Sequence, residues 1–122
     1  MKMTYQTGIC GEKTASEWLT SRKGMKLLES RFRTKAGEID LIMLDGETVV
    51  FVEVKTRLRS PSGSGLMTVD RKKQYRISRA AMLYLLKKGW TNRPVRFDAV
   101  EVNSGEVIHI PDAFQPGGVF FH

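Results

Sequence analysis

Apolar residues recur every three or four positions in two segments of the chain, which predicts two amphipathic helices. The first covers residues 11–23, and Gly24 is a typical stop signal for it. The second runs from about residue 69 to residue 88 and ends before Gly89. The apolar positions of the second helix fall on one stripe, so that face is expected to pack on a core: Ile77, Ala80, Ala81 and Tyr84.

Segments rich in β-branched and aromatic residues predict strands before and after the second helix. The clearest local pattern is a β-hairpin, with strands over residues 38–44 and 47–57 joined by Asp45-Gly46 as a two-residue turn. Weaker or shorter strands are expected at residues 26–33, 95–102 and 107–110.

Two charged residues, Glu53 and Lys55, lie inside the most strand-like stretch of the hairpin. Side chains alternate along a strand, so both share a face with Phe51. The predicted turn sets Asp40 opposite Phe51, diagonal to Glu53 and on the same face. A buried carboxylate is costly unless a partner, hydrogen bonds or a metal offsets its desolvation. We therefore expect Asp40, Glu53 and Lys55 on one wall of the sheet, where two carboxylates can share a divalent ion.

Each carboxylate also has a purely structural explanation. Glu53 can form a plain cross-strand ion pair with Lys55 or Lys35, and Asp40 can be a carboxylate at the sheet rim. Glu12 lies in the first turn of the predicted helix and faces the core or its rim. There it either favours the positive end of the helix dipole or takes part in catalysis.

Length and residue usage narrow the class of protein. The 122 residues support a single domain, with a loosely packed or disordered tail expected from about residue 115. Cys10 is the only cysteine and the two histidines are far apart, which excludes a disulfide framework and a zinc site of recognisable spacing. Oxygen ligands would hold any metal, which suits Mg²⁺ or Mn²⁺. No stretch approaches about 18 apolar residues and no signal peptide is recognisable, so the cytosol is the expected location.

Charge is distributed unevenly along the chain. Residues 55–96 carry 12 Lys/Arg against Asp70 alone, a balance of +11, whereas the whole chain has a net charge of +7. A dense positive block directly after the Glu53–Lys55 strand suggests a polyanionic partner such as nucleic acid. A solvated basic face is the alternative explanation.

Several basic residues of the second helix have a defined place on it. Lys72, Arg76 and Arg79 form a stripe at helical spacing, whose mutual repulsion either a phosphate chain or solvation offsets. Lys73 is on the inward side of the first turn and is expected to point into the site. Asp98 falls on a strand expected to adjoin the hairpin, and its role stays open.

Together these segments resemble the YraN-like family of small bacterial proteins. That family is similar to archaeal Holliday-junction resolvases and to the restriction-endonuclease-like PD-(D/E)xK superfamily. The resemblance covers residues 11–114 approximately and implies an α/β fold with an α-β-β-β-α-β core, a mixed central sheet flanked by helices. The segments that carry it are Gly11-Glu12, Gly37-Glu38-Ile39-Asp40-Leu41-Ile42, Val50-Phe51-Val52-Glu53-Val54-Lys55-Thr56-Arg57 and Val95-Arg96-Phe97-Asp98.

The resemblance implies a role for each matching position. Asp40 matches the motif aspartate, Glu53 the acidic residue of (D/E)xK, Lys55 its lysine, and Glu12 the first-helix glutamate of the resolvase-like branch. Ile39 stands where the superfamily name expects proline. The implied activity is cleavage of phosphodiester bonds in DNA with Mg²⁺ or Mn²⁺, with branched or otherwise structured DNA as the expected substrate.

In this hypothesis of an Mg²⁺-dependent endodeoxyribonuclease, Asp40, Glu53 and the Val54 carbonyl hold the ion and Glu12 supports it. Lys55 orients the attacking water or stabilises the phosphorane. A homodimer is expected only by analogy with resolvases. Two other classes stay open: a non-catalytic nucleic-acid-binding or assembly protein on the same fold, and a protein-interaction domain with an incidental basic surface. Phosphate binding is assigned to Arg57, Arg59, Lys72, Lys73, Arg76 and Arg79.

Overall fold

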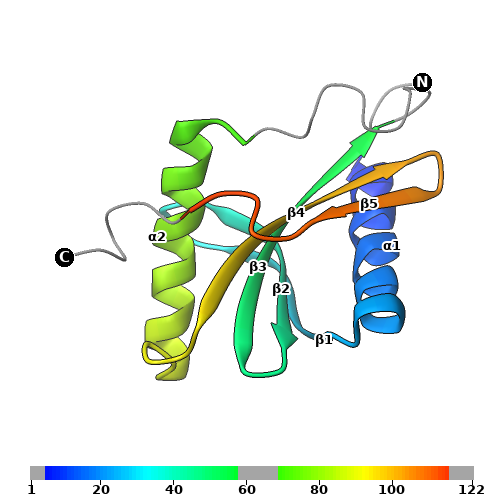
Figure 1. The fold of residues 1–122 in the computed structure, drawn as a ribbon. Coiled ribbons are helices and arrows are strands. Elements are labelled where there is room, and N and C mark those ends of the chain that lie inside the picture. Colours follow the sequence, from blue (N-terminus) through cyan, green and yellow to red (C-terminus); the bar gives the residue numbers. More distant parts are fainter. Residues whose placement is uncertain (1–4, 58–68, 116–122) are drawn as a thin grey trace.

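The computed structural model describes residues 5–57 and 69–115, which form two helices and five strands (Figure 1). The predicted α/β class and the predicted α-β-β-β-α-β order are confirmed, with a short fifth strand at one edge of the sheet. None of the helices described is long and apolar enough to cross a membrane. In chain order the elements are α1 (Tyr5–Lys23), β1 (Lys26–Arg33), β2 (Glu38–Asp45), β3 (Thr48–Arg57), α2 (Arg71–Lys88), β4 (Val95–Asn103) and β5 (Glu106–Ile110).

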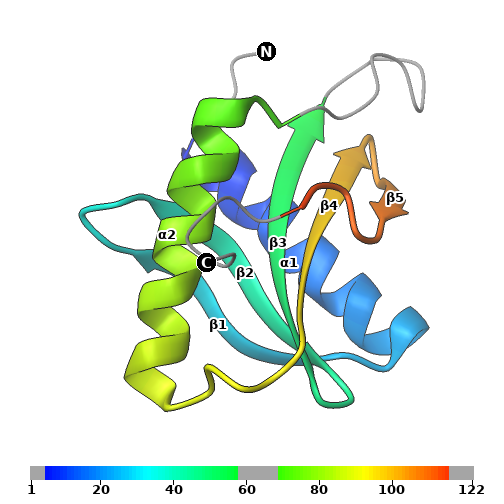
Figure 2. The same ribbon diagram turned by 60° about the vertical axis from the view of Figure 1, so that its left-hand side comes forward.

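The five strands form one mixed sheet in the order β1-β2-β3-β4-β5. Strands β3 and β4 are parallel, and the other neighbours are antiparallel. Parallel neighbours need a crossover connection, and here α2 supplies it. This crossover helix covers one face of the sheet, and α1 covers the opposite face (Figures 1 and 2).

Each face of the sheet has its own apolar core. On the α2 face, Phe51 stacks on Phe97 with ring centroids 5.5 Å apart, and the edge of Tyr84 contacts Phe51. After β5 the chain returns to this face, where Phe114 packs 5.1 Å from Phe97. The stripe predicted for α2 is buried, as expected. On the α1 face, the core consists of Ala15, Leu19, Met25, Leu41, Met43, Val50, Val52, Val100 and Val102.

The ends of the helices test the predicted boundaries. Asp70 caps α2 by accepting the Lys73 N–H at 2.8 Å, and Gly89, with φ of 71°, ends it. Both ends lie within two residues of the prediction. The predicted start of the first helix at residue 11 was wrong, because α1 begins at Tyr5. The apolar period that located this helix becomes visible only from Ala15 onward.

The register of the hairpin differs by two residues from the prediction. Asp45 pairs with Thr48 and Leu41 with Val52, so Gly46 and Glu47 form the turn. Continuing this register sets Asp40 level with Glu53, not with Phe51. Because side chains alternate with a period of two, a shift of two residues does not move a side chain to the other face. The predicted proximity of Asp40 and Glu53 therefore survives the error in register.

Strand β1 changes face at Arg31, whose φ of 52° is unusual for a residue other than glycine. Ser30 lines a pocket under α1, whereas Phe32 packs on Tyr84 of α2 with centroids 5.2 Å apart. In a regular strand these two side chains would share a face. In the register with β2, Arg31 lies level with Asp40.

Asp98 of β4 is completely buried and anchors a polar network that joins four parts of the chain. Its carboxylate accepts hydrogen bonds from Arg96 Nε and Nη2 at 2.8 and 3.0 Å, and from the Asp112 N–H at 2.9 Å. His109 Nε2 of β5 lies 2.7 Å away, and Arg96 Nη1 continues to Asp45 Oδ2 at 3.1 Å. Burial alone would raise the pKa of Asp98, but the bonds from His109, Arg96 and Asp112 outweigh it and lower the pKa. The role of Asp98 is thus structural.

We expect Asp98→Asn to lower the free energy of unfolding by about 3–5 kcal/mol, because it removes the buried counter-ion of the partly buried Arg96. Asp45→Asn removes the more exposed partner of the same guanidinium and should cost only about 0–1 kcal/mol. Urea unfolding of both variants measures the difference. The lowered pKa means that the carboxylate stabilises the fold above its unfolded pKa, and that this contribution is lost as pH falls through the folded value. Equal costs for the two variants would contradict the network.

Candidate functional site

Both helices begin at the end of the sheet where β3 ends and β2 starts (Figures 1 and 2). Each of four elements contributes an ionisable side chain there. Glu12 comes from α1, Asp40 from β2, Glu53 from β3 and Lys73 from α2. The charge of Asp40 acts on all three of the others, so Asp40 is the centre of the group.

Asp40 occupies the point at which β2 and β3 separate. The paired residues of these strands end with Leu41 and Val52. Beyond them, Asp40 Oδ2 accepts the backbone N–H of Val54 at 2.8 Å. A side-chain oxygen thus satisfies a donor that the neighbouring strand no longer pairs. The same bond aims the Asp40 carboxylate at β3, beside Glu53.

Glu53 is buried, with 8% of its surface exposed, and its carboxyl group shares a hydrogen bond with Asp40. Burial and the neighbouring Asp40 raise the pKa of Glu53 to about 8, although Lys73 opposes the rise. Lys73 Nζ lies 2.9 Å from Glu53 Oε2, as an ion pair and not as a well-directed hydrogen bond. The partner of Glu53 is therefore a helix lysine, and neither Lys55 nor Lys35 as the structural alternative expected.

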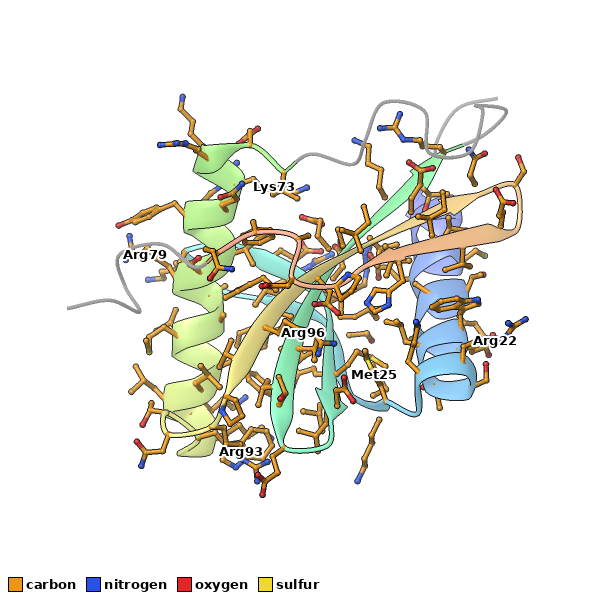
Figure 3. The ribbon with its side chains drawn as sticks, in the orientation of Figure 1. Arg22, Met25, Lys73, Arg79, Arg93 and Arg96 are labelled. Atoms are coloured by element: carbon orange, nitrogen blue, oxygen red, sulfur yellow. The ribbon has the colours of Figure 1, made fainter. Side chains whose placement is uncertain are left out.

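The two lysines of the site come from different elements. Asp70 fixes the first turn of α2 through the Lys73 N–H, and the Lys73 amine extends from α2 toward the sheet (Figure 3). The expectation that Lys73 points into the site is thereby met. Lys55 follows Glu53 by two residues on β3 and is exposed. The predicted trio is thus divided, with Asp40 and Glu53 in contact and Lys55 at the solvent-exposed rim.

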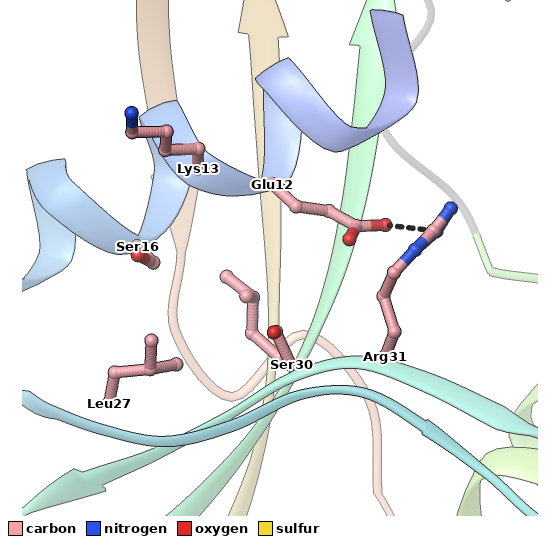
Figure 4. Close-up of a pocket in the computed structure, with 7 residues that line it drawn as sticks. Glu12, Lys13, Ser16, Leu27, Ser30 and Arg31 are labelled. Atoms are coloured by element: carbon pink, nitrogen blue, oxygen red, sulfur yellow. Dashed lines mark ion pairs between the residues drawn. The ribbon is translucent and has the colours of Figure 1, made fainter. Parts of the chain in front are cut away.

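Glu12 reaches the site because α1 approaches β3 very closely. A Cβ at Gly11 would collide with Oγ1 of Thr56, so only glycine allows this approach. Glu12 Oε2 lies 3.5 Å from Arg31 Nη1 (Figure 4). Burial and then the negative charge of Asp40 raise the pKa of Glu12 to about 7, against the opposing charge of Arg31. Glu12 is also one wall of a pocket of about 210 Å³ that is further lined by Lys13, Ser16, Leu27, Ser30, Arg31 and Leu41.

Arg31 is a member of the site that sequence reasoning missed. Its guanidinium lies between Glu12 and Glu38, at 3.5 and 3.9 Å. Nothing in the residue types of β1 distinguishes Arg31 from Arg33, two positions later. The left-handed backbone at residue 31 is what places it here, and only the three-dimensional structure reveals that conformation.

The residues predicted to bind phosphate do not share one setting, and Lys73 is paired with Glu53 as described above. Arg57 Nε lies 2.9 Å from Glu101 Oε1, so a nearly buried carboxylate of β4 already neutralises its charge. Arg59 lies outside the described residues. Lys72, Arg76 and Arg79 are exposed on α2, a helix with seven Lys/Arg and no Asp/Glu.

The site offers a pair of carboxylates and not a triad. Within residues 5–57 and 69–115, no three Asp, Glu, His or Cys side chains gather closely enough to hold a metal together. Asp40 and Glu53 are in contact, and Glu12 interacts with Asp40 at longer range. A metal here would depend on these two carboxylates, a backbone oxygen and water.

Comparison with solved structures finds a distant likeness. The crystal structure of SSO0001 aligns with a TM-score of 0.43 and 15% identity, over 90% of this chain and 52% of that chain. This chain therefore spans about half of that protein's length. A likeness of this degree bears on neither mechanism nor substrate.

Sequence relatives are much closer. A UPF0102 protein of Pseudomonas putida strain W619 is 48% identical over 94 residues, which is 76% of each chain. Another, from Thermodesulfovibrio yellowstonii, is 42% identical over 111 residues, 89% of this chain and 96% of its own. A third, from Alkalilimnicola ehrlichii, is 45% identical over 114 residues, 93% of this chain and 90% of its own.

The family model described as Uncharacterised protein family UPF0102 matches residues 11–102, from the glycine that admits α1 to the sheet through most of β4. That span contains all four ionisable groups of the site. The chain belongs to UPF0102, the family that the YraN-like resemblance indicated.

Proposed function

We propose that this protein is a divalent-metal-dependent nuclease that cuts phosphodiester bonds in DNA, with branched or structured DNA as its substrate. One observation carries the proposal. Two carboxylates, Asp40 and Glu53, are held in contact at the end of a sheet, against the first turn of a helix that carries seven basic residues. Like charges at this distance oppose each other, and a cation relieves that opposition.

The donor set suits a hard divalent cation. Mg²⁺ takes one or two carboxylates and keeps several waters, so a pair of acids suffices for it. Asp40, Glu53 and the carbonyl oxygen of Val54 would be the protein ligands. Glu12 would support a metal-bound water. When bound, Mg²⁺ or Mn²⁺ supplies a Lewis acid and a water of lowered pKa.

The side chains around the pair have the properties that this chemistry uses. The raised pKa of Glu12, about 7, allows it to accept or release a proton near neutral pH. Lys55, exposed at the rim, would lie beside the scissile phosphate and stabilise the negative charge that develops on it. Lys73 would favour the charged form of the Glu53 carboxylate and face the incoming strand.

The basic surface of α2 would hold the nucleic acid. Lys72, Arg76 and Arg79 are exposed and would contact backbone phosphates, which positions a strand without reading its sequence. Arg57 would contribute less, because Glu101 already pairs with it. Arg59 keeps its proposed role as a phosphate contact. A homodimer in the cytosol would place two such sites on one branched substrate.

Glu53→Gln and Lys55→Ala should each lower the rate of DNA cutting by about 10²-fold or more. The first removes a ligand of the cation, and the second removes positive charge beside the reacting phosphate. Glu47→Gln, in the turn at the other end of the hairpin, is the matched control and should cut normally. The measurement is cleavage of linear, supercoiled and four-way-junction DNA with Mg²⁺ or Mn²⁺.

The same assay separates the alternative functions. Salt-sensitive DNA binding without cutting, in the wild type as in the variants, would support a non-catalytic nucleic-acid-binding protein. If the protein neither binds nor cuts DNA, the result would support the third alternative, a protein-interaction domain.

Cation binding should stabilise the protein more at high pH than at low pH. The folded state binds the Glu53 proton more tightly than the unfolded state, so stability falls as pH rises from the ordinary value of 4.5 toward about 8. A cation binds the deprotonated pair and displaces that proton. The rise in Tm with Mn²⁺ should therefore be larger at about pH 8.5 than at about pH 6. It should vanish in Glu53→Gln.

Calorimetric titration of Mn²⁺ into Asp40→Asn tests the ligand assignment without any substrate. Loss of the binding heat is the expected result, because one of two carboxylate ligands is gone. Unchanged affinity would remove Asp40 from the proposed set.

The helix surface can be tested separately from the chemistry. Lys72→Ala should weaken duplex binding and reduce the slope of log affinity against log salt by about one, as the loss of one phosphate contact requires. Arg22→Ala removes an exposed cation from α1, far from α2 (Figure 3), and should leave the slope unchanged. Fluorescence anisotropy over a series of salt concentrations measures both.

A further inference from the structure

An exposed aromatic ring lies among the cations of α2. Half of the surface of Tyr75 is accessible. The guanidinium of Arg79 lies over its ring, with Cζ 5.8 Å from the centroid. Tyr75 also lines a shallow cavity of about 420 Å³ together with Arg71, Lys72 and Arg76. We call this cavity the α2 depression.

The setting of Tyr75 differs from that of the other large exposed apolar residues. A single exposed apolar side chain is ordinary and needs no explanation. Leu83 and Leu86 of α2 are exposed in this way, at 45% and 59%, but neither lines the α2 depression. By contrast, Tyr84 of the same helix is buried in the core. Among the large apolar residues that are exposed in residues 5–57 and 69–115, Tyr75 is the one with an aromatic ring, and basic side chains surround it.

Helical geometry connects Tyr75 with the candidate active site. At about 100° per residue and measured from Lys73, Arg76 lies about 60° round the helix, Lys72 about 100°, Arg79 about 120° and Tyr75 about 160°, all in one direction. The helix is about 10–12 Å across with its side chains, so this arc is roughly 15 Å long. Lys73 points toward the sheet, and Arg79 lies on the outer side (Figure 3). Cations therefore line the whole path from Glu53 to Tyr75.

We propose that Tyr75 and the basic side chains of the α2 depression form a nucleobase-binding site, which selects DNA with an unpaired nucleotide a short distance from the bond that is cut. The selection of a cut strand rests on the proposed nuclease function, whereas the binding of an unpaired base does not.

The chemistry of the depression fits a single strand better than a duplex. Aromatic side chains in a positively charged groove bind single strands by stacking on successive bases, regardless of sequence. A base paired in the interior of a duplex is already stacked on both sides and has no face to offer to Tyr75. The phosphates on either side of the base would contact Lys72 and Arg76. Helix α2 carries no acidic side chain that would repel them.

A protein partner would use the helix differently. An acidic amphipathic segment would cover Leu83 and Leu86 as well as Tyr75, because all three are exposed on α2. Leu83 lies about 12 Å further along the helix axis than Tyr75. Leu83→Ala is therefore both the matched control for nucleobase binding and the test of this rival.

Binding is measured by fluorescence anisotropy in EDTA, where no metal-dependent cutting occurs. The probes are a blunt duplex and the same duplex with a single-stranded extension at either end. Tyr75→Ala should weaken binding of the extended duplexes by about tenfold, the loss expected for one stacked base, and leave the blunt duplex unchanged. Tyr75→Phe keeps the ring and should bind as the wild type does, as should Leu83→Ala. An equal loss on blunt and extended duplexes, or a loss in Leu83→Ala, would overturn the proposal.

A second readout reports stacking directly. An extension that contains 2-aminopurine should lose fluorescence on binding to the wild type and to Tyr75→Phe, but not to Tyr75→Ala. Because Tyr75 is on the surface, the Tm of each variant should match that of the wild type. Quenching that persists in Tyr75→Ala would place the base elsewhere.

The two proposals fail in different ways. DNA cutting that depends on Glu53, with Tyr75→Ala binding extensions as tightly as the wild type, would end the nucleobase site and leave the nuclease. Selective binding of extensions through Tyr75, without cutting under any metal, would support the nucleobase site and end the nuclease.

Discussion

The contact between the carboxyl groups of Asp40 and Glu53 determines the arrangement of everything around it. Two acids placed together out of water oppose their own ionisation, and this is why the pKa of Glu53 rises to about 8. The fold compensates with a backbone N–H from Val54 and an ammonium group from Lys73. An arrangement that costs stability and persists through such support is characteristic of a functional site.

The two halves of strand β3 differ in burial and in charge. Its first half, Val49 to Val52, is fully buried and holds the two apolar cores together. Its second half, from Glu53 onward, carries the charged groups of the site and becomes exposed at Lys55. The buried half therefore positions the charged half, as is usual where a site must be held in a defined geometry.

The acidic and basic side chains of the site also come from different elements. The carboxylates of the site come from α1, β2 and β3, whereas α2 contributes only cations. Lys73 is the point where the two meet, because it belongs to the basic helix and contacts the acidic pair. A polyanion attracted by α2 would thus be brought next to the carboxylate pair of Asp40 and Glu53.

The buried polar network at Asp98 has a different purpose from the site, although both contain desolvated carboxylates. At Asp98 every partner donates a hydrogen bond, so its pKa falls and the charge is fully satisfied. At Glu53, burial and the neighbouring Asp40 raise the pKa, and the ammonium group of Lys73 opposes that rise only in part. Both carboxylates are buried, and the groups around each one decide the direction in which its pKa moves.

The sequence by itself determined the element order, the apolar stripe of α2 and the shared neighbourhood of Asp40 and Glu53. These follow from periods of 3.6 and 2, which are local and survive a register error of two residues. Only the tertiary structure decided that Lys73 and not Lys55 pairs with Glu53, that Arg31 contacts Glu12, and that Arg57 is held by Glu101. Long side chains from separate elements find partners according to how those elements pack and where one backbone angle departs from the strand, and no local pattern encodes either.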